Sequence, residues 1–532
     1  MQRNSMRENR ENPSPPVQSA GRRENAMSGK SFTNGGGESY SGVVPTKQPN
    51  KSENSPAEAV EERPLAKENT QEPNSCRTPS RESEPNGLAR VREAAKKDKK
   101  LRFTALLHHV NIDLLRDSYS GLKKQAAPGV DDMTWKEYGE NLEARLADLH
   151  GRIHRGAYHA KPSRRVWIPK PDGRQRPLGV AALEDKIVQR AVGTVLNQIW
   201  EEDFLGFSYG FRPKRSQHDA LDALWVGIMS KKVNWILDLD IRSFFDKLQH
   251  DWLIKFVEYR MGDKRVVRLI QKWLKAGVLE EGQWIETEEG SPQGSVISPI
   301  LANLYLHYVL DVWIEVWRKK LAQGDVIIVR YADDAVLGFE RREEAERFLE
   351  QLRERVAKFG LELQPDKTRL IEFGRFAAER RNKRGEGKPE TFNFLGFTHY
   401  CGVNHTTGKF TVHRKTIGKR MAAKLKDIKA KLRKRMLAGL TNTVEWLQQT
   451  VRGYFQFHAI PGNTSRLSTF RREVQRLWLR TLRRRSQRSR LTWEKFSNGL
   501  ATLLPPVRVL QPYPNVRFAA KHPNCQGKNR VR

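Results

Sequence analysis

The sequence predicts an α+β fold that is followed by a basic helical region. Residues 160–400 mix helical hydrophobic patterns with short β-branched runs, which is typical of α+β proteins. Two of these runs, at residues 235–241 and 326–339, are interrupted by aspartates. From about residue 410 onward, apolar residues recur every three or four positions among many lysines and arginines, which indicates a helical bundle.

The charge balance indicates a polyanionic partner. The chain has 532 residues, with 96 Lys plus Arg against 62 Asp plus Glu, a formal net charge of +34 and a pI near 10.1. Each phosphate that a cation neutralises releases counterions, so a nucleic acid fits this excess of charge. An anionic membrane is the alternative, but no apolar run approaches the roughly 18 residues that a spanning helix needs.

Cysteine usage and the N-terminus predict a cytoplasmic protein. Cys76, Cys401 and Cys525 are scattered, which fits a reducing compartment and excludes a disulfide framework or a zinc module built on paired cysteines. The first thirty residues are polar, so we expect no secretory signal.

The two ends of the chain are expected to differ from its middle. Residues 1–88 are rich in Ser, Asn, Gly, Pro, Glu and Arg and have few large apolar side chains. Such a segment cannot bury enough surface to offset the entropy of ordering, so we predict disorder. A helical pattern begins at Leu88, and residues 501–532 are predicted to form a basic tail.

The stretch VRYADDAVLGF predicts a hairpin with two acids at its tip. Residues 326–329 are a β-branched run, and a second apolar run follows Asp333 and Asp334. A polar turn that needs an aspartate to begin it is the simpler alternative.

A second acidic position lies in WILDLDIRSFFDKLQH, residues 235–250. The run that ends at Ile241 should be a buried strand, yet Asp238 and Asp240 interrupt it. If Asp240 faces Asp333 and Asp334, repulsion would raise the pKa values of the three carboxylates unless divalent cations neutralised them. Oxygen ligands favour Mg²⁺, and two such ions about 4 Å apart support phosphoryl transfer. Separate, salt-bridged acids are the alternative.

These stretches resemble reverse transcriptases, and most closely the reverse transcriptase/maturase proteins encoded by group II introns. The motifs that carry the resemblance are YADD, DIRSFFD, GSPQGSVISPILANLYL, AAPGVDDMTW, WIPKPDGRQRPLGV, DFLGFSYGFRP, GLELQPDKTRLIEFG, FNFLGF, GYFQFHAIPGN, RLWLRTLRRRSQRSRLTWEKF and PYPNVRF. They extend over nearly everything from about residue 100 onward, and the last of them resemble bacterial class C members.

The resemblance implies a right-hand polymerase fold. Residues 89–400 would form the fingers and palm, with the core motifs at about 150–397, and residues 410–500 the thumb and the maturase region called domain X. Asp240, Asp333 and Asp334 would hold two Mg²⁺ ions, with the backbone carbonyl of Ile241 as a further metal ligand.

The resemblance also implies a set of nucleotide contacts. Lys170 and Arg176 would grip the triphosphate of a deoxynucleotide, Gln293 in SPQG would lie near the nucleotide and template, and Phe245 would lie beside the sugar. Lys367 would protonate the departing pyrophosphate, and an ion pair with Asp366 is the alternative explanation for this lysine. The alternatives are surface charges, an ordinary loop and a core phenylalanine.

Seven cations are predicted to bind RNA through the thumb region. Because Lys and Arg far outnumber acids there, pairing within the helices cannot neutralise them, although charged faces are most often merely solvated. The predicted residues are Lys424, Lys429, Arg433, Lys434, Arg483, Arg484 and Arg485.

The function implied is RNA-directed DNA synthesis by a bacterial protein that also binds its host intron RNA, assists splicing and copies the intron in retrohoming. The partners would be intron RNA, an RNA template, a DNA primer or target and deoxynucleoside triphosphates. The chain lacks the cysteine pairs of the family's endonuclease module, so we do not expect it to cut the second DNA strand. Alternatives are a retron- or defence-type reverse transcriptase, or an RNA-binding splicing maturase without polymerase activity.

Overall fold

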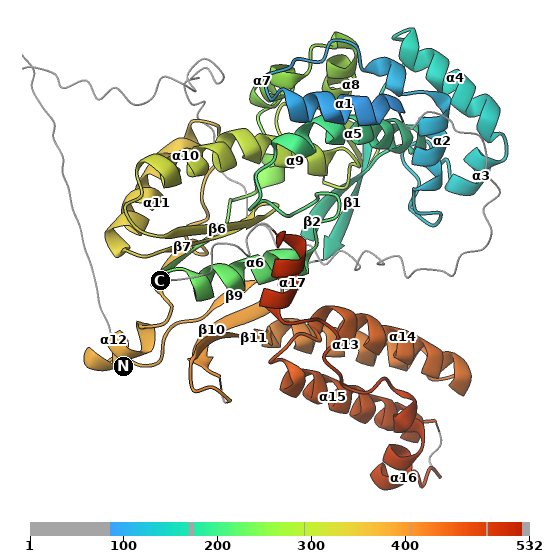
Figure 1. Cartoon of the computed structure of the whole chain (residues 1–532). Coiled ribbons are helices and arrows are strands. Elements are labelled where there is room, and N and C mark those ends of the chain that lie inside the picture. The colour runs from blue at the N-terminus through green and yellow to red at the C-terminus, as the bar shows by residue number, and fades with distance from the viewer. Residues whose placement is uncertain (1–85, 170–174, 292, 405, 486–487, 524–532) are drawn as a thin grey trace, which may run out of the picture. The chain divides into compact units, whose positions relative to one another are not determined.

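The computed structural model describes residues 86–169, 175–291, 293–404, 406–485 and 488–523 of the chain. All of them belong to one unit, Thr46–Arg532. The segment predicted to be disordered lies outside the described residues up to residue 85, and helix α1 begins at Asn86. Figure 1 labels the elements that follow.

Four helices lead into the first sheet: α1 (Asn86–Lys97), α2 (Ile112–Ser120), α3 (Trp135–Gly139) and α4 (Leu142–His154). Side chains cap two of them, because Asn111 accepts from the backbone N–H of Leu114 and Thr134 forms a reciprocal capping box with Glu137. Helices α1 and α2 pack on α5 (Leu183–Asp203), whose apolar positions are almost entirely buried.

A four-stranded sheet, which we call the hairpin sheet, has the order β2-β1-β4-β5. Its strands are β1 (Ser163–Pro169), β2 (Gln175–Val180), β4 (Val278–Glu280) and β5 (Gln283–Ile285). Strands β1 and β2 are antiparallel, with Ile168 opposite Arg176 and Arg164 opposite Val180. The turn expected at Gly173 lies outside the described residues.

A second four-stranded sheet carries the aspartates, and we call it the central sheet. It has the antiparallel order β6-β7-β3-β8, formed by β3 (Trp235–Leu239), β6 (Val326–Tyr331), β7 (Asp334–Phe339) and β8 (Arg369–Glu372). Figure 1 shows α10 and α11 on one side of this sheet and α6 on the other. The apolar contact with α6 includes Ile236, Ile327 and Val336.

The helices around the central sheet are α6 (Gln217–Ser230), α7 (His250–Arg260), α8 (Lys264–Lys275), α9 (Ser298–Leu306), α10 (Val312–Lys320) and α11 (Arg342–Ala357). A π-helical turn, η3 (His307–Asp311), joins α9 to α10 without a break. Such turns carry an extra residue and are frequent at functional sites.

A three-stranded sheet connects the central sheet to the C-terminal helices. After α12 (Ala377–Lys383), it is formed by β9 (Phe392–Phe394), β10 (Phe397–Val403) and β11 (Phe410–Thr416) in the order β11-β10-β9. The helical region predicted from residue 410 therefore begins only at Gly418, because the chain first completes β11.

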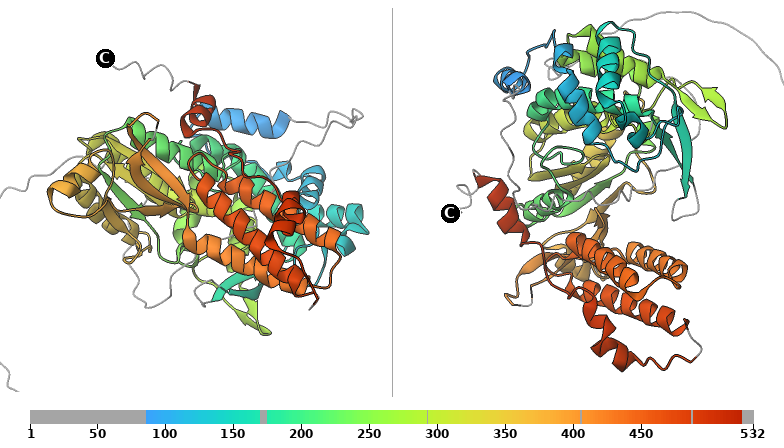
Figure 2. Two further views of the ribbon diagram at one scale, coloured as in Figure 1. Left: turned by 90° about the horizontal axis from the view of Figure 1, so that it is seen from below. Right: turned by 90° about the vertical axis from the view of Figure 1, so that its right-hand side faces the viewer.

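The C-terminal helices have a core of their own. The bundle consists of α13 (Gly418–Lys434), α14 (Leu440–His458), α15 (Thr464–Arg483) and α16 (Trp493–Asn498), and both views of Figure 2 show α13–α15 packed side by side in orange and red. Ile428, Leu447, Phe470 and Trp478 are fully buried at its centre. The apolar stripe that the sequence showed is therefore the inner face of this bundle.

The segment expected to be a basic tail is folded as far as the structure describes it. Residues 500–503 form the short helix η4 and Pro514–Lys521 form helix α17, which packs on α6. Arg517 Nε donates to Asp222 at 2.5 Å, and Lys521 Nζ donates to Asp219 at 2.7 Å. The basic residues of this segment thus meet buried acids of α6.

Candidate active site

The predicted hairpin forms, and one of its two aspartates lies at the tip. Strands β6 and β7 pair up to Tyr331 opposite Asp334, which leaves Ala332 and Asp333 as the two turn residues. Ala332 has a φ of +56°, the left-handed conformation that tight hairpin turns require. Asp334 is the first residue of β7.

Asp240 lies across from this turn because of the strand register. The predicted buried strand is β3, in which Asp238 is opposite Val336 and Leu239 is opposite Ala335. Asp240 directly follows the last pair of this ladder, and Asp334 directly precedes Ala335, so both lie at the same end of the two strands. Asp334 is two residues before Val336, so it projects from the same face of the sheet as Asp238.

The electrostatics show how closely these carboxylates lie. Burial raises the pKa of Asp334 well above its usual value, and the negative charges of Asp333, Asp240 and Asp238 raise it further. Burial also raises the pKa of Asp238 to about 7, with Arg369 opposing the rise and Asp240 adding to it. This end of the sheet therefore favours binding of positive charge.

Lys367 supplies one such charge. Its ammonium nitrogen lies 2.9 Å from Asp240 Oδ2 and 3.1 Å from Oδ1. The chain around Lys367 runs beside the end of β3, where Gln364 N–H donates to the carbonyl of Asp240 at 2.8 Å and Leu363 pairs with Ile241. The sequence suggested Asp366 as an alternative partner for Lys367, and the structure pairs it with Asp240.

The oxygen-rich donor set fits a divalent cation in its chemistry, although the carboxylates are not yet arranged around one point. Within the described residues, no group of three or more His, Cys, Asp or Glu side chains is placed to hold a metal ion. The ammonium of Lys367 against Asp240 accounts for part of this difference from the expected convergence. The raised pKa of Asp334 shows that an added cation would relieve repulsion there.

The SPQG loop joins the hairpin sheet to the turn that follows Asp240. Arg176 Nε donates to Gln293 Oε1 at 2.8 Å, and Gln293 Nε2 donates to Asp246 Oδ1 at 3.2 Å. The backbone N–H of Gly179 donates to the carbonyl of Gln293 at 2.7 Å, and that of Ser291 donates to Phe245 at 2.8 Å. Pro292 and Lys170 lie outside the described residues.

The two neighbouring phenylalanines differ in burial. Phe244 is 1% exposed, whereas Phe245 is partly exposed. In a strand, neighbouring side chains alternate between the two faces, but Phe244–Asp246 form a short 3-10 helix, entered through Ser243 with a φ of +45°. This helical turn, and not strand alternation, leaves the ring of Phe245 partly exposed.

The seven cations predicted to bind RNA fall into two groups. Lys429, Arg433, Lys434 and Arg484 are exposed. The other three have contacts within the chain, although Arg483 and Arg485 are exposed as well and Lys424 is partly exposed. Lys424 lies 3.6 Å from Asp427, Arg483 Nε donates to the carbonyl of Leu491 at 2.7 Å, and Arg485 Nη2 donates to that of Ala438 at 2.9 Å.

Sequence reasoning missed the residues that support the aspartate turn from behind. Arg330 and Asp311 form a buried ion pair at 2.5 Å, next to Ser208 and Asn303. The signal was present in the sequence, since each is a lone charge within an apolar run, and buried charges require partners.

Among the described residues, no helix combines the length and the apolar character needed to cross a lipid bilayer.

The chain is similar to known proteins over its middle part. The family model "Reverse transcriptase (RNA-dependent DNA polymerase)" matches residues 168–399, which include strands β6 and β7 and Asp240. Protein YkfC of Escherichia coli K12 is 37% identical over 240 residues, which are 40% of this chain and 62% of that protein. Group II intron-encoded protein LtrA of Lactococcus lactis is 35% identical over 210 residues, which are 38% of this chain and 34% of LtrA.

An uncharacterised 91 kDa protein in the cob intron of Schizosaccharomyces pombe is 37% identical over 210 residues, 39% of this chain and 25% of that protein. The chain thus spans less than two thirds of each of these relatives. Residues 168–399 of this chain are a reverse transcriptase domain, homologous to parts of a group II intron-encoded protein and of other intron proteins.

Proposed function

We propose that the chain is an RNA-directed DNA polymerase whose chemistry takes place at Asp240, Asp333 and Asp334. The observation that carries this proposal is the β3–β7 register, whose last pair is Leu239 opposite Ala335, so that Asp240 and Asp334 lie next to it at the same end of the sheet as the turn. In this proposal the central sheet is the palm, the hairpin sheet belongs to the fingers, and the bundle α13–α16 is the thumb and maturase region.

Asp240, Asp333, Asp334 and the carbonyl of Ile241 would hold two Mg²⁺ ions. When bound, these ions would supply the positive charge that phosphoryl transfer requires at the attacking and leaving oxygens. The raised pKa of Asp334 supports a site that gains stability when cations enter.

The neighbouring residues would bind and orient the nucleotide. Arg176, together with Lys170, would grip the triphosphate, and its bond to Gln293 links the fingers strand to the turn that carries Phe245 and Asp246. The partly exposed ring of Phe245 would lie against the sugar. Lys367, whose ammonium group contacts Asp240 in this structure, would donate a proton to the departing pyrophosphate.

The finer part of the proposal is that the chain binds its host intron RNA, assists splicing and copies the intron during retrohoming. Similarity to LtrA, which is a group II intron-encoded protein, supports it. The exposed cations Lys429, Arg433 and Lys434 on α13 offer a surface for an RNA backbone.

The Asp333→Asn variant tests the polymerase site. Loss of one carboxylate should reduce primer extension on an RNA template by about a thousandfold or more, because the reacting charges lose their counter-charge. RNA binding and assisted splicing should stay near wild type, since the proposed RNA surface lies on another element.

Asp325→Asn is the matched control, because Asp325 precedes β6 at the opposite end of the hairpin and pairs with Lys231. It should extend primers normally. Near-normal extension by Asp333→Asn would show that Asp333 is not part of the catalytic site. A wild-type chain that extends no primer would overturn the proposed activity. Loss of splicing in Asp333→Asn would contradict the separation of the two surfaces.

A further inference from the structure

A buried ion pair lies on the face of the central sheet opposite the aspartates. Arg330 Nε donates to Asp311 Oδ1 at 2.7 Å and Nη2 donates to Oδ2 at 2.5 Å, a two-pronged contact between side chains that are 1% and 0% exposed. Arg330 is opposite Ala335 in the β6–β7 ladder, and the next pair, Tyr331 opposite Asp334, is the last before the turn. The ion pair is therefore next to the turn formed by Ala332 and Asp333.

The π-helical turn brings two residues that accept hydrogen bonds from Arg330, Asn303 and Asp311, toward the same side of the helix. Asn303 on α9 and Asp311 at the end of η3 are eight residues apart, and in a regular α-helix they would be separated by about 80° around the axis. A π-helical turn carries more residues per turn, which brings the two side chains closer to one face. Arg330 Nη1 accordingly also donates to Asn303 Oδ1, at 3.2 Å.

The rest of the guanidinium reaches the turn itself. Arg330 Nη1 donates to the carbonyl of Ala332 at 2.8 Å, and that carbonyl belongs to the peptide that joins Ala332 to Asp333. Ala332 is held at a φ of +56°, which costs free energy in a residue with a Cβ and so requires support from its surroundings. The contact with Arg330 supplies such support directly before Asp333.

The loop 204–216, from the motif DFLGFSYGFRP, closes on the same residues. Tyr209 N–H donates to the carbonyl of Arg330 at 2.8 Å, and Arg330 Nη2 donates to Ser208 Oγ at 2.7 Å. A Cβ at Gly210 would lie only 2.2 Å from the nitrogen of Ala332, so the loop lies directly against the turn and requires glycine there.

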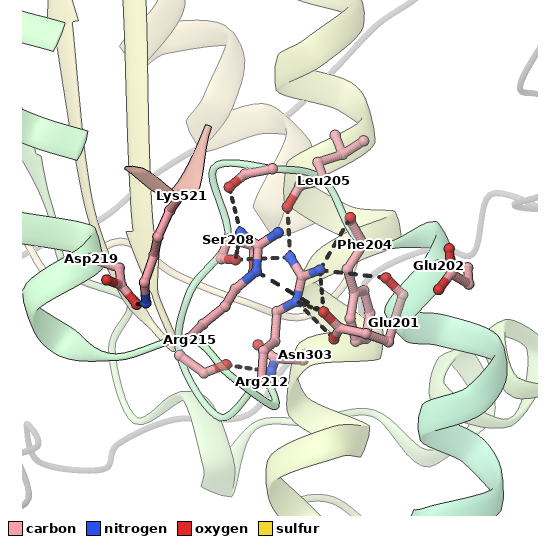
Figure 3. Close-up of polar contacts among 12 residues, drawn as sticks. Glu201, Glu202, Phe204, Leu205, Ser208, Arg212, Arg215, Asp219, Asn303 and Lys521 are labelled. Atoms are coloured by element: carbon pink, nitrogen blue, oxygen red, sulfur yellow. Dashed lines mark hydrogen bonds and ion pairs between the residues drawn. The ribbon is translucent and has the colours of Figure 1, made fainter. Parts of the chain in front are cut away.

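A second arginine fixes the position of this loop. Figure 3 shows Arg212 surrounded by acceptors of the loop and of α5: its Nη1 donates to the carbonyls of Leu205 at 2.7 Å and Ser208 at 2.8 Å, and its Nη2 donates to Glu201 at 2.8 Å. Asn303 Nδ2 donates to the carbonyl of Gly210 at 2.6 Å. The support behind the turn is thus itself rigid.

We propose that Arg330 is a positioning residue that sets the Ala332–Asp333 peptide, and through it the direction of the Asp333 carboxylate toward a divalent cation. The proposal rests on the proposed polymerase site and adds to it a buried support made of Arg330, Asp311 and Ser208. A purely structural ion pair would stabilise the fold without affecting how tightly the aspartates bind a cation.

The Arg330→Lys variant separates these two roles. Lysine keeps the positive charge next to Asp311, but one ammonium group cannot also reach Ala332 and Ser208 as the guanidinium does. We measure Mn²⁺ binding to the full chain by water-proton relaxation, without nucleic acid, together with the melting temperature. Mn²⁺ affinity should fall about tenfold or more, the range expected when a residue that orients a metal ligand is lost.

Arg260→Lys is the matched control. Arg260 is 0% exposed, its Nη1 donates to both carboxylate oxygens of Asp203 at 2.9 and 3.0 Å, and its Nη2 donates to the carbonyl of Asp98 at 3.1 Å. It should lower the melting temperature without changing Mn²⁺ affinity. If both variants lose Mn²⁺ binding only in proportion to stability, or if Arg330→Lys binds Mn²⁺ as wild type does, the proposal is overturned.

Two further variants keep the test decisive. In an Asp333→Asn background, Arg330→Lys should have no additional effect on Mn²⁺ binding if it acts through Asp333, and an additive effect would contradict the proposal. If Arg330→Lys does not fold, Ser208→Ala removes one of its anchors and should weaken Mn²⁺ binding about threefold, the effect of one hydrogen bond. No change in Ser208→Ala would then count against the proposal.

Primer extension by the same wild-type preparation is measured separately. A chain that extends no primer but shows the Mn²⁺ pattern retains the role of Arg330 and loses the proposed activity. Normal primer extension by the wild type, together with unchanged Mn²⁺ binding in Arg330→Lys, would retain the proposed activity and overturn the role of Arg330.

Discussion

The ammonium group of Lys367 lies 2.9 Å from the carboxylate of Asp240, on a segment that also pairs its backbone with the end of β3. Asp240 is in turn close to the partly exposed Asp334, whose pKa is raised by burial and by three neighbouring carboxylates. A lysine side chain therefore shares the space in which the proposed cations would bind. Its release from Asp240 would accompany their entry.

Two substitutions distinguish the roles of Lys367. If its proton is transferred to the departing pyrophosphate, both Lys367→Arg and Lys367→Met should lower kcat for DNA synthesis about a hundredfold, because arginine keeps its proton. If only charge is needed, Lys367→Arg should stay near wild type while Lys367→Met is slow. Single-turnover nucleotide addition is the measurement, and equal, normal rates in all three proteins would exclude Lys367 from the chemistry.

Phe245 is expected to exclude ribonucleotides. A bulky ring against C2′ rejects an added hydroxyl by steric clash, so Phe245→Ala should raise ribonucleotide incorporation by about one to several orders of magnitude. Phe244→Ala is the control, because this ring is 1% exposed and its loss should cost about 3–5 kcal/mol of stability without changing sugar preference. A Phe245→Ala chain that discriminates as wild type does would transfer this role to another residue.

The exposed cations of α13 should set the salt dependence of RNA binding. Reversing the charge at Lys429, Arg433 and Lys434 should lower affinity, and each lost phosphate contact should reduce the log–log salt slope by about 0.7 to 0.9. Equilibrium binding to structured RNA over a range of KCl concentrations gives both quantities.

The control for this experiment is reversal at three exposed cations of α8, Lys264, Arg268 and Lys275. It changes net charge by the same amount on a different element. If both triple variants flatten the slope equally, the effect reflects net charge, and α13 has no special role.

Stability should fall at mildly acidic pH because of His399. Its ring is fully buried and stacks on Phe392 with ring centroids 4.8 Å apart, and burial together with Arg414 lowers its pKa to about 3. Between about pH 3 and the ordinary pKa of 6.5, the unfolded chain binds the proton and the folded chain does not, so stability falls as pH falls through this window.

His399→Phe removes one of several histidines whose pKa burial lowers, the others including His307 and His458, and should reduce the dependence of the melting temperature on pH in that window. His413→Phe, which changes a partly exposed ring on the neighbouring strand β11, is the control and should leave the slope as in wild type. Equal slopes in His399→Phe and wild type would show that His399 is not the group responsible.

The sequence by itself determined the local structure of the site. The β-branched run before Asp333 and the apolar run after it predicted a hairpin, and β6 and β7 form it, because continuous apolar runs suit strands that are buried on both faces. The apolar stripes of α13 and α15 likewise predicted the inner face of the bundle. The motifs also identified the reverse transcriptase domain that the family model matches at residues 168–399.

Only the tertiary structure decided which residues meet. The register that brings Asp240 and Asp334 to the same end of the sheet depends on the pairing of strands about ninety residues apart, and no local pattern fixes that pairing. The same holds for Lys367 on Asp240 and for the link from Arg176 through Gln293 to Asp246.

Arg330 shows the limit most clearly. A lone arginine in an apolar strand requires a buried partner, but the sequence contains many acids, and choosing Asp311 needs the π-helical turn that rotates it toward the sheet. Likewise, the basic C-terminal residues appeared suited to solvent, yet Arg517 and Lys521 meet Asp222 and Asp219 on α6. Composition determines how many charges must be satisfied, whereas long-range packing decides which charges satisfy one another, because Coulomb attraction acts between neighbours in space whatever their distance in sequence.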